Sequence, residues 1–358
     1  MWHARALGTD SIVQRSPSLP TPRGPLSNAL LGYLAGTGRT LPDDVEQDLD
    51  LGSVLSDDDF QLALYCCYEL HYRGFDVGVD AEWDPAVLQF RRRLEVAFET
   101  ALLDQVPLDS ANPSERDADS SPADRLLNLI AQADGPSLST FMEVDGTRRQ
   151  LQEFAIHRSL YQLKEADAHT WGIPRFIGPA RSALVEIQMD EYGNGQVGAA
   201  HAELFALTME GLDLDPTYGA YLDHVGGTTL ATMNLISLFG LHRRLLPALL
   251  GHLAVFENTS VMPMARYARA GQRLGVGLAG QRFFNVHVIA DEHHGPLAAD
   301  HMVGEFIAAH PEDEGLVIWG ASCLMKLEGR LTAELLAAWE QGDTSLRDAS
   351  CLLEPTSV

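Results

Sequence analysis

Apolar residues recur at helical spacing along most of this chain, and few segments show the period-two alternation that is typical of strands. The pattern is clearest after residue 121, in segments such as LLNLIAQA, RRQLQEFAIHRSLYQLKEADAH and TTLATMNLISLFGL. The sequence shows no internal repeat. Because a helix with one apolar face must bury that face against other helices, the pattern predicts an all-α bundle. A site in such a bundle would be built from inward-facing side chains on different helices.

The change of composition along the chain predicts four segments. Residues 1–55 are a lead-in, first rich in Pro and Ser and then acidic, which we expect to be poorly ordered. Residues 56–120 are expected to form an N-terminal helical extension that ends in an exposed linker. Residues 121–345 carry the main run of helical patterns, and residues 346–358 form a tail.

Three local signals predict where individual helices begin. Ser56, with Asp59 three residues later, resembles a capping box and introduces a helix that should end near Gly74. Pro85 follows an Asp and Pro122 follows a Ser, and Pro is suited to the first helical position. We therefore expect helices to start at these three points.

The charge balance restricts the partners of this chain. It has 50 acidic and 25 basic residues, which gives a formal net charge of -25 at pH 7. Such a charge repels nucleic-acid phosphates and anionic lipid surfaces. No apolar run approaches the ~20 residues needed to span a bilayer, and the first residues lack the apolar core of a signal peptide. We expect a cytoplasmic protein that binds neither nucleic acid nor membrane.

The cysteines give no sign of metal or redox chemistry. Cys66 and Cys67 are adjacent, Cys323 and Cys351 are isolated, and none has the CxxC spacing of a zinc knuckle or a redox dithiol. We expect these thiols to be buried core residues.

One short segment, FFNVHVIADEHHGPLA, concentrates His, Asp and Glu side chains. At about 100° per residue, His287, Asp291 and His294 fall on one narrow stripe of a helix, because steps of four and seven residues return to nearly the same face. Glu292 and His293 point elsewhere, and the neighbouring Phe, Val and Ile residues favour partial burial of the helix. The segment therefore predicts three potential metal ligands that point in one direction.

A metal site inside a bundle also needs ligands from other helices. Acidic or His side chains in largely apolar helical surroundings that could serve are Glu165, Glu191, His201 and Glu257. With the stripe they make four carboxylates and three imidazoles, and four negative charges balance two divalent cations. Such ligands suit iron or manganese, whereas the lack of paired thiolates argues against structural zinc. Four buried carboxylates would repel one another without metal, so metal binding would keep them ionised.

These residues resemble the motif of the haem-oxygenase-like di-iron oxidase and oxygenase family, also called the iron-containing redox enzymes. That family carries a glutamate on its first core helix, a glutamate and a histidine roughly ten residues apart, another glutamate, and a helix with His-x3-Asp-x2-His. The residues that match in order and type are Glu165, Glu191, His201, Glu257, His287, Asp291 and His294. The resemblance covers about residues 145–310, and EIQMDEYGNG, LFGLHRR and GHLAVFENTS are similar to phrases of its long actinobacterial branch.

The resemblance implies a haem-oxygenase-like helical bundle over residues 121–345 that binds no haem. It also implies that the seven residues hold two Fe(II) ions, with manganese as a substitute, in a cluster that assembles reversibly. O2 would be the co-substrate, and a peroxo di-iron species would oxidise a small organic substrate such as an amine, an amino acid or an aliphatic acid. The implied partners are this substrate, an external electron donor and a second copy of the chain in a homodimer.

Other classes of function remain open at this stage. One is a metal-free small-molecule-binding protein or cofactorless oxidase of the same helical superfamily, and another is an interaction module whose helices are merely acidic. A ferritin-like di-iron protein is disfavoured, because that architecture uses two Glu-x-x-His pairs and this chain has only the related pair of Asp291 and His294.

The assignment of Glu165 has rivals nearby. Asp167 and His169 lie a few residues away and could take its place as a ligand. Glu186 and Asp190 are expected at the surface or just outside the ligand shell, since they flank the candidate ligand on the same predicted helix.

Glu191 and His201 raise a geometric question. Ten helical residues turn through about 1000°, so the two side chains are about 80° out of phase on an ideal helix. Gly193 and Gly195 lie between them and would allow either a widened turn or a break between two helices. Both arrangements would align the two side chains.

Overall fold

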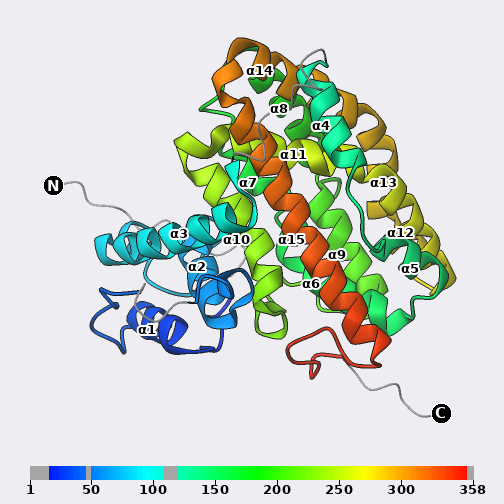
Figure 1. Cartoon of the computed structure of the whole chain (residues 1–358). Coiled ribbons are helices and arrows are strands. Elements are labelled where there is room, and N and C mark those ends of the chain that lie inside the picture. Colours follow the sequence, from blue (N-terminus) through cyan, green and yellow to red (C-terminus); the bar gives the residue numbers. More distant parts are fainter. Residues whose placement is uncertain (1–15, 46–49, 109–119, 353–358) are drawn as a thin grey trace, which may run out of the picture.

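The computed structural model describes residues 16–45, 50–108 and 120–352 (Figure 1). Over these ranges the chain consists of helices, turns and loops, without a strand, so the predicted all-α fold is confirmed. Parts of the predicted lead-in, linker and tail lie outside the described residues, at positions 1–15, 46–49, 109–119 and 353–358.

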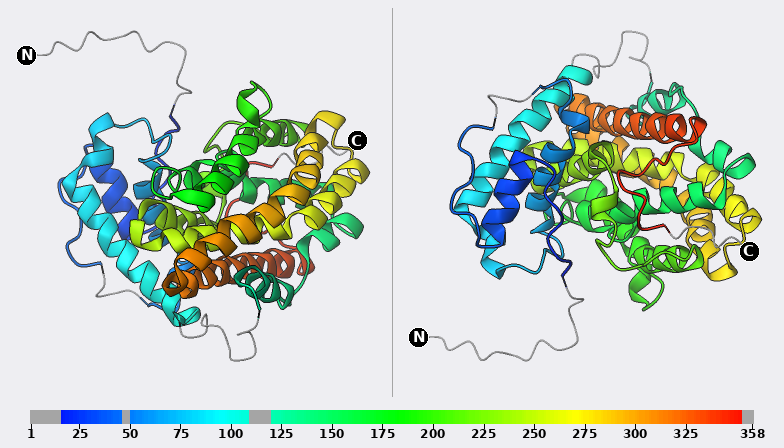
Figure 2. Two further views of the ribbon diagram at one scale, coloured as in Figure 1. Left: turned by 90° about the horizontal axis from the view of Figure 1, so that it is seen from above. Right: turned by 90° about the horizontal axis from the view of Figure 1, so that it is seen from below.

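The N-terminal part contains the helices α1 (Pro25–Leu34), α2 (Asp58–Glu69) and α3 (Pro85–Gln105). They lie together at one end of the molecule, where α1 packs on α2 and α2 packs on α10 (Gly227–Leu241) (Figures 1 and 2). The prediction of a poorly ordered lead-in is wrong for residues 25–34. Leu30 and Leu31 are buried, and the Asp59 carboxylate accepts hydrogen bonds from the first N–H groups of α1, so this short helix is anchored at both its side and its start.

The predicted helix starts are confirmed for α3 and for α4 (Pro122–Ala131), each of which has Pro at its first position. The start of α2 is one residue later than predicted. Asp57, and not Ser56, is the capping residue, and its carboxylate accepts a hydrogen bond of 2.7 Å from the backbone N–H of Phe60.

The remaining helices form the main bundle. Their bounds are α5 (Leu138–Val144), α6 (Arg148–Gln162), α7 (Asp167–Thr170), α8 (Gly178–Glu191), α9 (His201–Gly211), α11 (Leu246–Thr259), α12 (Val261–Arg273), α13 (Leu278–Pro296), α14 (Glu305–Ala309) and α15 (Glu314–Glu340). Helix α13 packs on α9, α11 and α12, and it continues into a π-helical segment, Leu297–Gly304. The long helix α15 runs across the bundle in front of α11 (Figure 1).

Two glycines allow α11 and α15 to approach closely. A Cβ atom on Gly251 would lie 1.9 Å from the carbonyl oxygen of Val317, and a Cβ atom on Gly320 would lie 2.2 Å from that of Ala248. Both distances are far below van der Waals contact, so only glycine fits at either position. The backbones of the two helices are therefore in direct contact, and α11 is held at a fixed distance from α15.

Buried apolar side chains form one continuous cluster that includes Phe60 of α2, Leu235 of α10 and Leu324 of α15. In the part of the chain that the structure describes, no single helix has both the length and the apolar character to cross a membrane. Two consecutive stretches, Arg243–Thr259 and Val261–Arg273, reach that length and apolar character only when they are taken together, and a sharp bend separates them.

Candidate metal centre

All seven residues that the sequence singles out come together in the main bundle. Helix α13 supplies His287, Asp291 and His294 from one face, as the helical stripe predicts, while Glu292 and His293 are exposed. The other four come from separate elements: Glu257 from α11, Glu191 from the end of α8, His201 from the start of α9, and Glu165 from the turn between α6 and α7.

A break between two helices aligns Glu191 with His201. Helix α8 ends at Glu191, α9 begins at His201, and the intervening turn has positive φ at Gly193, Asn194 and Gly195. A Cβ atom on Gly193 would lie 2.4 Å from the carbonyl carbon of Ala199, so the turn is tight as well as left-handed. Of the two arrangements that the sequence allowed, the break between helices is the one observed.

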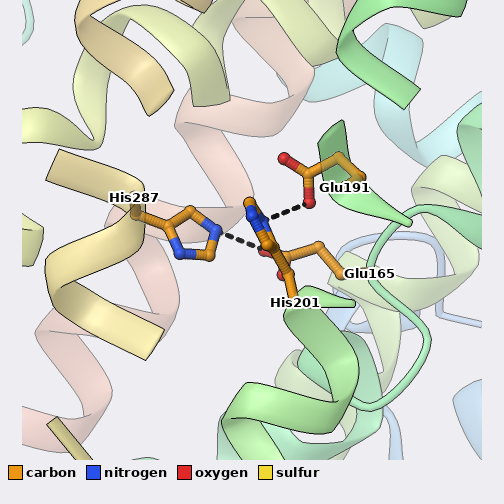
Figure 3. Close-up of side chains that lie close together, drawn as sticks. All are labelled: Glu165, Glu191, His201 and His287. Carbon is orange, nitrogen blue, oxygen red and sulfur yellow. Dashed lines mark ion pairs between the residues drawn. The ribbon is translucent and has the colours of Figure 1, made fainter. Parts of the chain in front are cut away.

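Four of the side chains form a first ligand group, shown in Figure 3. Each of Glu165, Glu191, His201 and His287 offers one atom, and these four atoms lie within 4.8 Å of one another. The Nδ1 atom of His201 is 2.8 Å from a Glu191 carboxylate oxygen, and the Nε2 atom of His287 is 3.5 Å from a Glu165 oxygen. Metal–ligand bonds of about 2.0–2.2 Å put no two ligand atoms more than about 4.4 Å apart, so a small inward movement of these side chains would suit one ion.

A second ligand group lies beside the first and shares Glu191 with it. Its members are Glu191, Glu257 and His294, again with one atom each within 4.8 Å of the others. The Nδ1 atom of His294 is 3.4 Å from a Glu257 oxygen and 3.7 Å from an Asp291 oxygen. Asp291 therefore lies next to the second group without being part of the compact set. Two neighbouring groups that share Glu191 could thus each hold a metal ion.

The centre is buried, and its acids and imidazoles face one another without well-aligned hydrogen bonds. Apart from Glu165, whose side chain is 11% exposed, each of the seven residues is at most 7% exposed. Buried atoms without a hydrogen bond among the described residues include His201 Nδ1, His287 Nε2, His294 Nδ1, Glu191 Oε2 and Asp291 Oδ2. The three nitrogens lie 2.8–3.7 Å from carboxylate oxygens of the centre, so acids and imidazoles face one another there without well-aligned hydrogen bonds. Nitrogen and carboxylate donors gathered in this way suit iron or manganese, and the residues present therefore fit a metal centre.

Protons occupy the centre when no metal is bound. Burial disfavours the charged form of His287, but the nearby carboxylates, Glu165 above all, outweigh it and raise the pKa of His287 to about 10. Burial likewise opposes protonation of His294, and its contacts with Asp291 and Glu257 raise its pKa to about 10. Burial raises the pKa of Glu257 itself to about 8. The metal-free centre thus holds protons at neutral pH.

Groups outside the centre orient three of its side chains. The Nδ1–H of His287 donates to the carbonyl oxygen of Phe283 at 2.9 Å, which directs Nε2 towards the carboxylates. The Nε2 atom of His294 lies 3.3 Å from the carboxylate of Asp190. With its nitrogen facing Glu165, the amide of Gln162 donates to that carboxylate. Ligand histidines in metalloproteins commonly have such outer partners.

The rivals of Glu165 have other partners. The Asp167 carboxylate accepts a hydrogen bond of 2.8 Å from the hydroxyl of Tyr192, and the His169 ring lies 3.2 Å from that of His252. Of the flanking acids, Glu186 is exposed and pairs with His293, while Asp190 contacts the ligand candidate His294. Of the two acids, only Asp190 thus contacts a residue of the centre, and its position in the sequence does not reveal this.

A cavity of about 950 Å³ adjoins the centre. Its wall includes Glu165, Glu191, Glu257, His287 and Asp291, so at least one face of the centre is open to a small molecule. Other residues of the wall are Phe154, Arg158, Tyr161, Phe256, Tyr267 and Glu328. The sequence did not assign any of these to a site, because the aromatic residues have the helical spacing of core residues and Arg158 and Glu328 belong to no motif.

Comparison with known proteins supports the same assignment. A family model described as iron-containing redox enzyme matches residues 152–329, a range that contains all seven residues of the centre. A nitrosourea synthase from Streptomyces achromogenes subsp. streptozoticus is 25% identical over 148 residues, which is 41% of this chain and 31% of that relative. The chain therefore aligns with less than a third of the relative's length. The predicted haem-oxygenase-like bundle is confirmed, and the chain belongs to the iron-containing redox enzyme family.

Proposed function

We propose that this protein is a non-haem di-iron oxidase or oxygenase that activates O2 to oxidise a small organic substrate. The observation that carries the proposal is the pair of buried ligand groups that share Glu191, in each of which the ligand atoms lie within 4.8 Å of one another. The donor set of carboxylates and imidazoles without thiolates suits iron, and manganese is the expected substitute.

The protein's own residues would hold and separate the two ions. Glu165, His201 and His287 would hold one, Glu257 and His294 the other, and Glu191 would bridge them. Asp291 would complete the second group by a small movement of its carboxylate towards the ion. Two bound Fe(II) ions would supply two electrons to reduce O2 to the peroxide level, and an external electron donor would restore the reduced state.

The cavity beside the centre supports a small substrate. Its volume of about 950 Å³ and its aromatic walls suit a molecule with an aliphatic or aromatic body, and its polar wall includes the ion pair of Arg158 and Glu328. We propose an amine, an amino acid or an aliphatic acid. Because a nitrosourea contains oxidised nitrogen, similarity to a nitrosourea synthase makes oxidation of an amino group the first outcome to test.

Metal titration tests the proposal directly. Under anaerobic conditions the protein should bind two Fe(II) ions per chain and should then consume O2 on exposure to air. His287→Ala and His294→Ala should each lower the iron content to about one, since each change removes a ligand from only one group. His293→Ala is the matched control, because His293 lies on the same helix with an exposed side chain and should leave both ions in place.

The outcomes separate the classes of function. Full retention of two ions in both ligand variants would contradict the assignment of the centre. A parent protein that binds no iron, even when Fe(II) is supplied without oxygen, would favour a metal-free binding protein or cofactorless oxidase of the same superfamily.

A further inference from the structure

The ligand candidate Glu165 lies in a turn and not within a helix. Helix α6 ends at Gln162 and α7 begins at Asp167, so the residues between them lack a continuous helical ladder. The side chains of Lys164 and Glu165 leave this turn in different directions. Glu165 reaches His287 in the metal centre, whereas Lys164 reaches Glu69 at the end of α2.

The contact between Lys164 and Glu69 is a buried ion pair. The Nζ atom of Lys164 is 2.7 Å from one carboxylate oxygen of Glu69, and the two side chains are 6% and 1% exposed. The hydroxyl of Tyr218 donates to the other oxygen of Glu69, also at 2.7 Å. Both oxygens are therefore satisfied, which is the condition under which a buried pair is well held.

Aromatic rings enclose the ammonium group of Lys164. Its Nζ atom lies 4.3 Å from the ring centroid of Tyr72 and 4.9 Å from that of Tyr65. A cation over the face of a tyrosine ring is attracted to it, and the attraction is stronger away from water. The Lys164 side chain is thus fixed by charge, by a hydrogen bond and by packing.

The backbone of the same turn is held as well. The Arg73 guanidinium donates to the carbonyl oxygen of Leu163 at 2.9 Å and lies 4.2 Å from the ring centroid of Tyr218. Arg73 and Glu69 therefore contact Leu163 and Lys164, the two residues immediately before Glu165. Arg73 and Glu69 both lie outside residues 152–329, the range that matches the family model.

We propose that Glu69 and Lys164 are positioning residues for the metal centre. They lie outside the centre and hold Glu165 in its place there. Glu165 lies between two helices, so no continuous helical ladder fixes the direction of its side chain. The contacts of Leu163 and Lys164 hold the turn instead and keep Glu165 within reach of the first ion. The N-terminal extension then serves the metal site, an inference that rests on the proposed function.

A double variant, Glu69→Gln with Lys164→Met, tests this role. It removes both charges together, so neither is left buried without its partner. The Fe(II) affinity of the first ligand group is measured under anaerobic conditions, in a His294→Ala background that leaves only that group complete. Losing a direct outer partner of a ligand costs about ten- to a hundredfold in metal affinity. Since Glu69 and Lys164 act on Glu165 only through the backbone of the turn, we expect the double variant to bind Fe(II) about tenfold more weakly, at the lower end of that range.

The matched control is Glu99→Gln with Arg244→Met. That ion pair also joins the N-terminal extension to the main bundle, but it lies on α3 and on the segment before α11, away from the turn of Glu165. It should leave the Fe(II) affinity at the parental value. Thermal unfolding of the metal-free proteins shows whether either double variant has lost its fold.

If the first double variant does not fold, Tyr218→Phe removes one hydrogen bond to Glu69 and keeps the ring, and it should weaken Fe(II) binding about threefold. Parental affinity in a folded double variant, or an equal loss in the control, would overturn the positioning role. A parent protein that binds no Fe(II) would instead overturn the proposed function and this inference with it.

Discussion

The two ligand groups of the proposed metal centre differ in how completely the protein prepares them. The first group has four side chains within reach of one ion, whereas the second has three, one of which it shares with the first. Its fourth candidate, Asp291, lies 3.7 Å from His294 and outside the compact set. Because a preformed set of ligands loses less conformational freedom on binding, we expect the first group to bind its ion more tightly.

The largest effect should come from the residue that both groups share. Glu191→Ala removes one ligand from each group, so we expect the variant to lose both ions. A change at His287 or His294 should cost the protein only one ion. Iron content after anaerobic loading is the measurement. Glu186→Ala on the same helix is the control, because the Glu186 side chain is exposed and its loss should leave the iron content unchanged. Retention of one tightly held ion by Glu191→Ala would show that the residue is not a bridge.

The pH should change metal affinity strongly in both groups. His287 and His294 have pKa values raised to about 10, so each is protonated at neutral pH and must lose its proton when an ion binds. Affinity should rise by about tenfold per pH unit for each proton displaced, which is about a hundredfold between pH 6 and 8 for the first ion. The rise should be steeper for the second ion, because below about pH 8 it also displaces the proton of Glu257. Affinity that is constant over this range, in a Co(II) or Fe(II) titration, would mean that neither imidazole is a ligand.

Stability of the metal-free protein should follow the opposite trend. The folded-state pKa of His287 and His294 lies above the ordinary value of 6.5, and that of Glu257 above 4.5, so the folded protein binds more protons than the unfolded chain. The stabilisation is complete at acid pH and is lost as the pH rises, through about 8 for Glu257 and about 10 for the histidines. Thermal unfolding between pH 6 and 9, with metal chelated, should show a falling midpoint.

Among the ligand variants, we expect the smallest effect on iron binding from Asp291, which lies beside the second ligand group. Asp291→Asn preserves size but removes one negative charge, so the second ion should bind about ten- to a hundredfold more weakly while the first is retained. O2 consumption should fall with it. The helix should persist, since Asn and Asp have similar helix propensity, although the metal-free variant loses the charge contact that Asp291 makes with the protonated His294. Two ions held at parental affinity, with unchanged O2 consumption, would show that Asp291 is not a ligand.

The sequence predicted those features that depend on local spacing. The stripe of His287, Asp291 and His294 was predictable because a helix returns to the same face after four and seven residues. The starts of α3 and α4 were predictable because Pro follows a capping residue at both. Helix α1 was missed, since its Pro- and Ser-rich approach is typical of loops and its anchor, Asp59, comes from a distant part of the chain.

Features that depend on distant contacts were beyond a single sequence. The turn at Gly193 left two arrangements open, and only the packing of the chain selects the break between α8 and α9. The pairing of Lys164 with Glu69 joins residues 95 positions apart, and Glu69 had no feature that marked it. The cavity wall was not predicted either. Tyr161 and Tyr267 have the spacing of core residues on their own helices, and only the packing of those helices brings them to one cavity.

The glycine contact between α11 and α15 has a consequence for how this enzyme can change. Helix α11 carries Glu257, while α15 contributes Leu324, Met325 and Glu328 to the cavity wall. Since the two backbones already touch at Gly251 and Gly320, α15 cannot move closer to the centre to make the cavity smaller. A shift of α15 away from the centre would disturb its packing on α11, the helix that carries Glu257. Substrate range should therefore evolve by exchange of side chains on α15, such as Met325, over a backbone frame that stays constant.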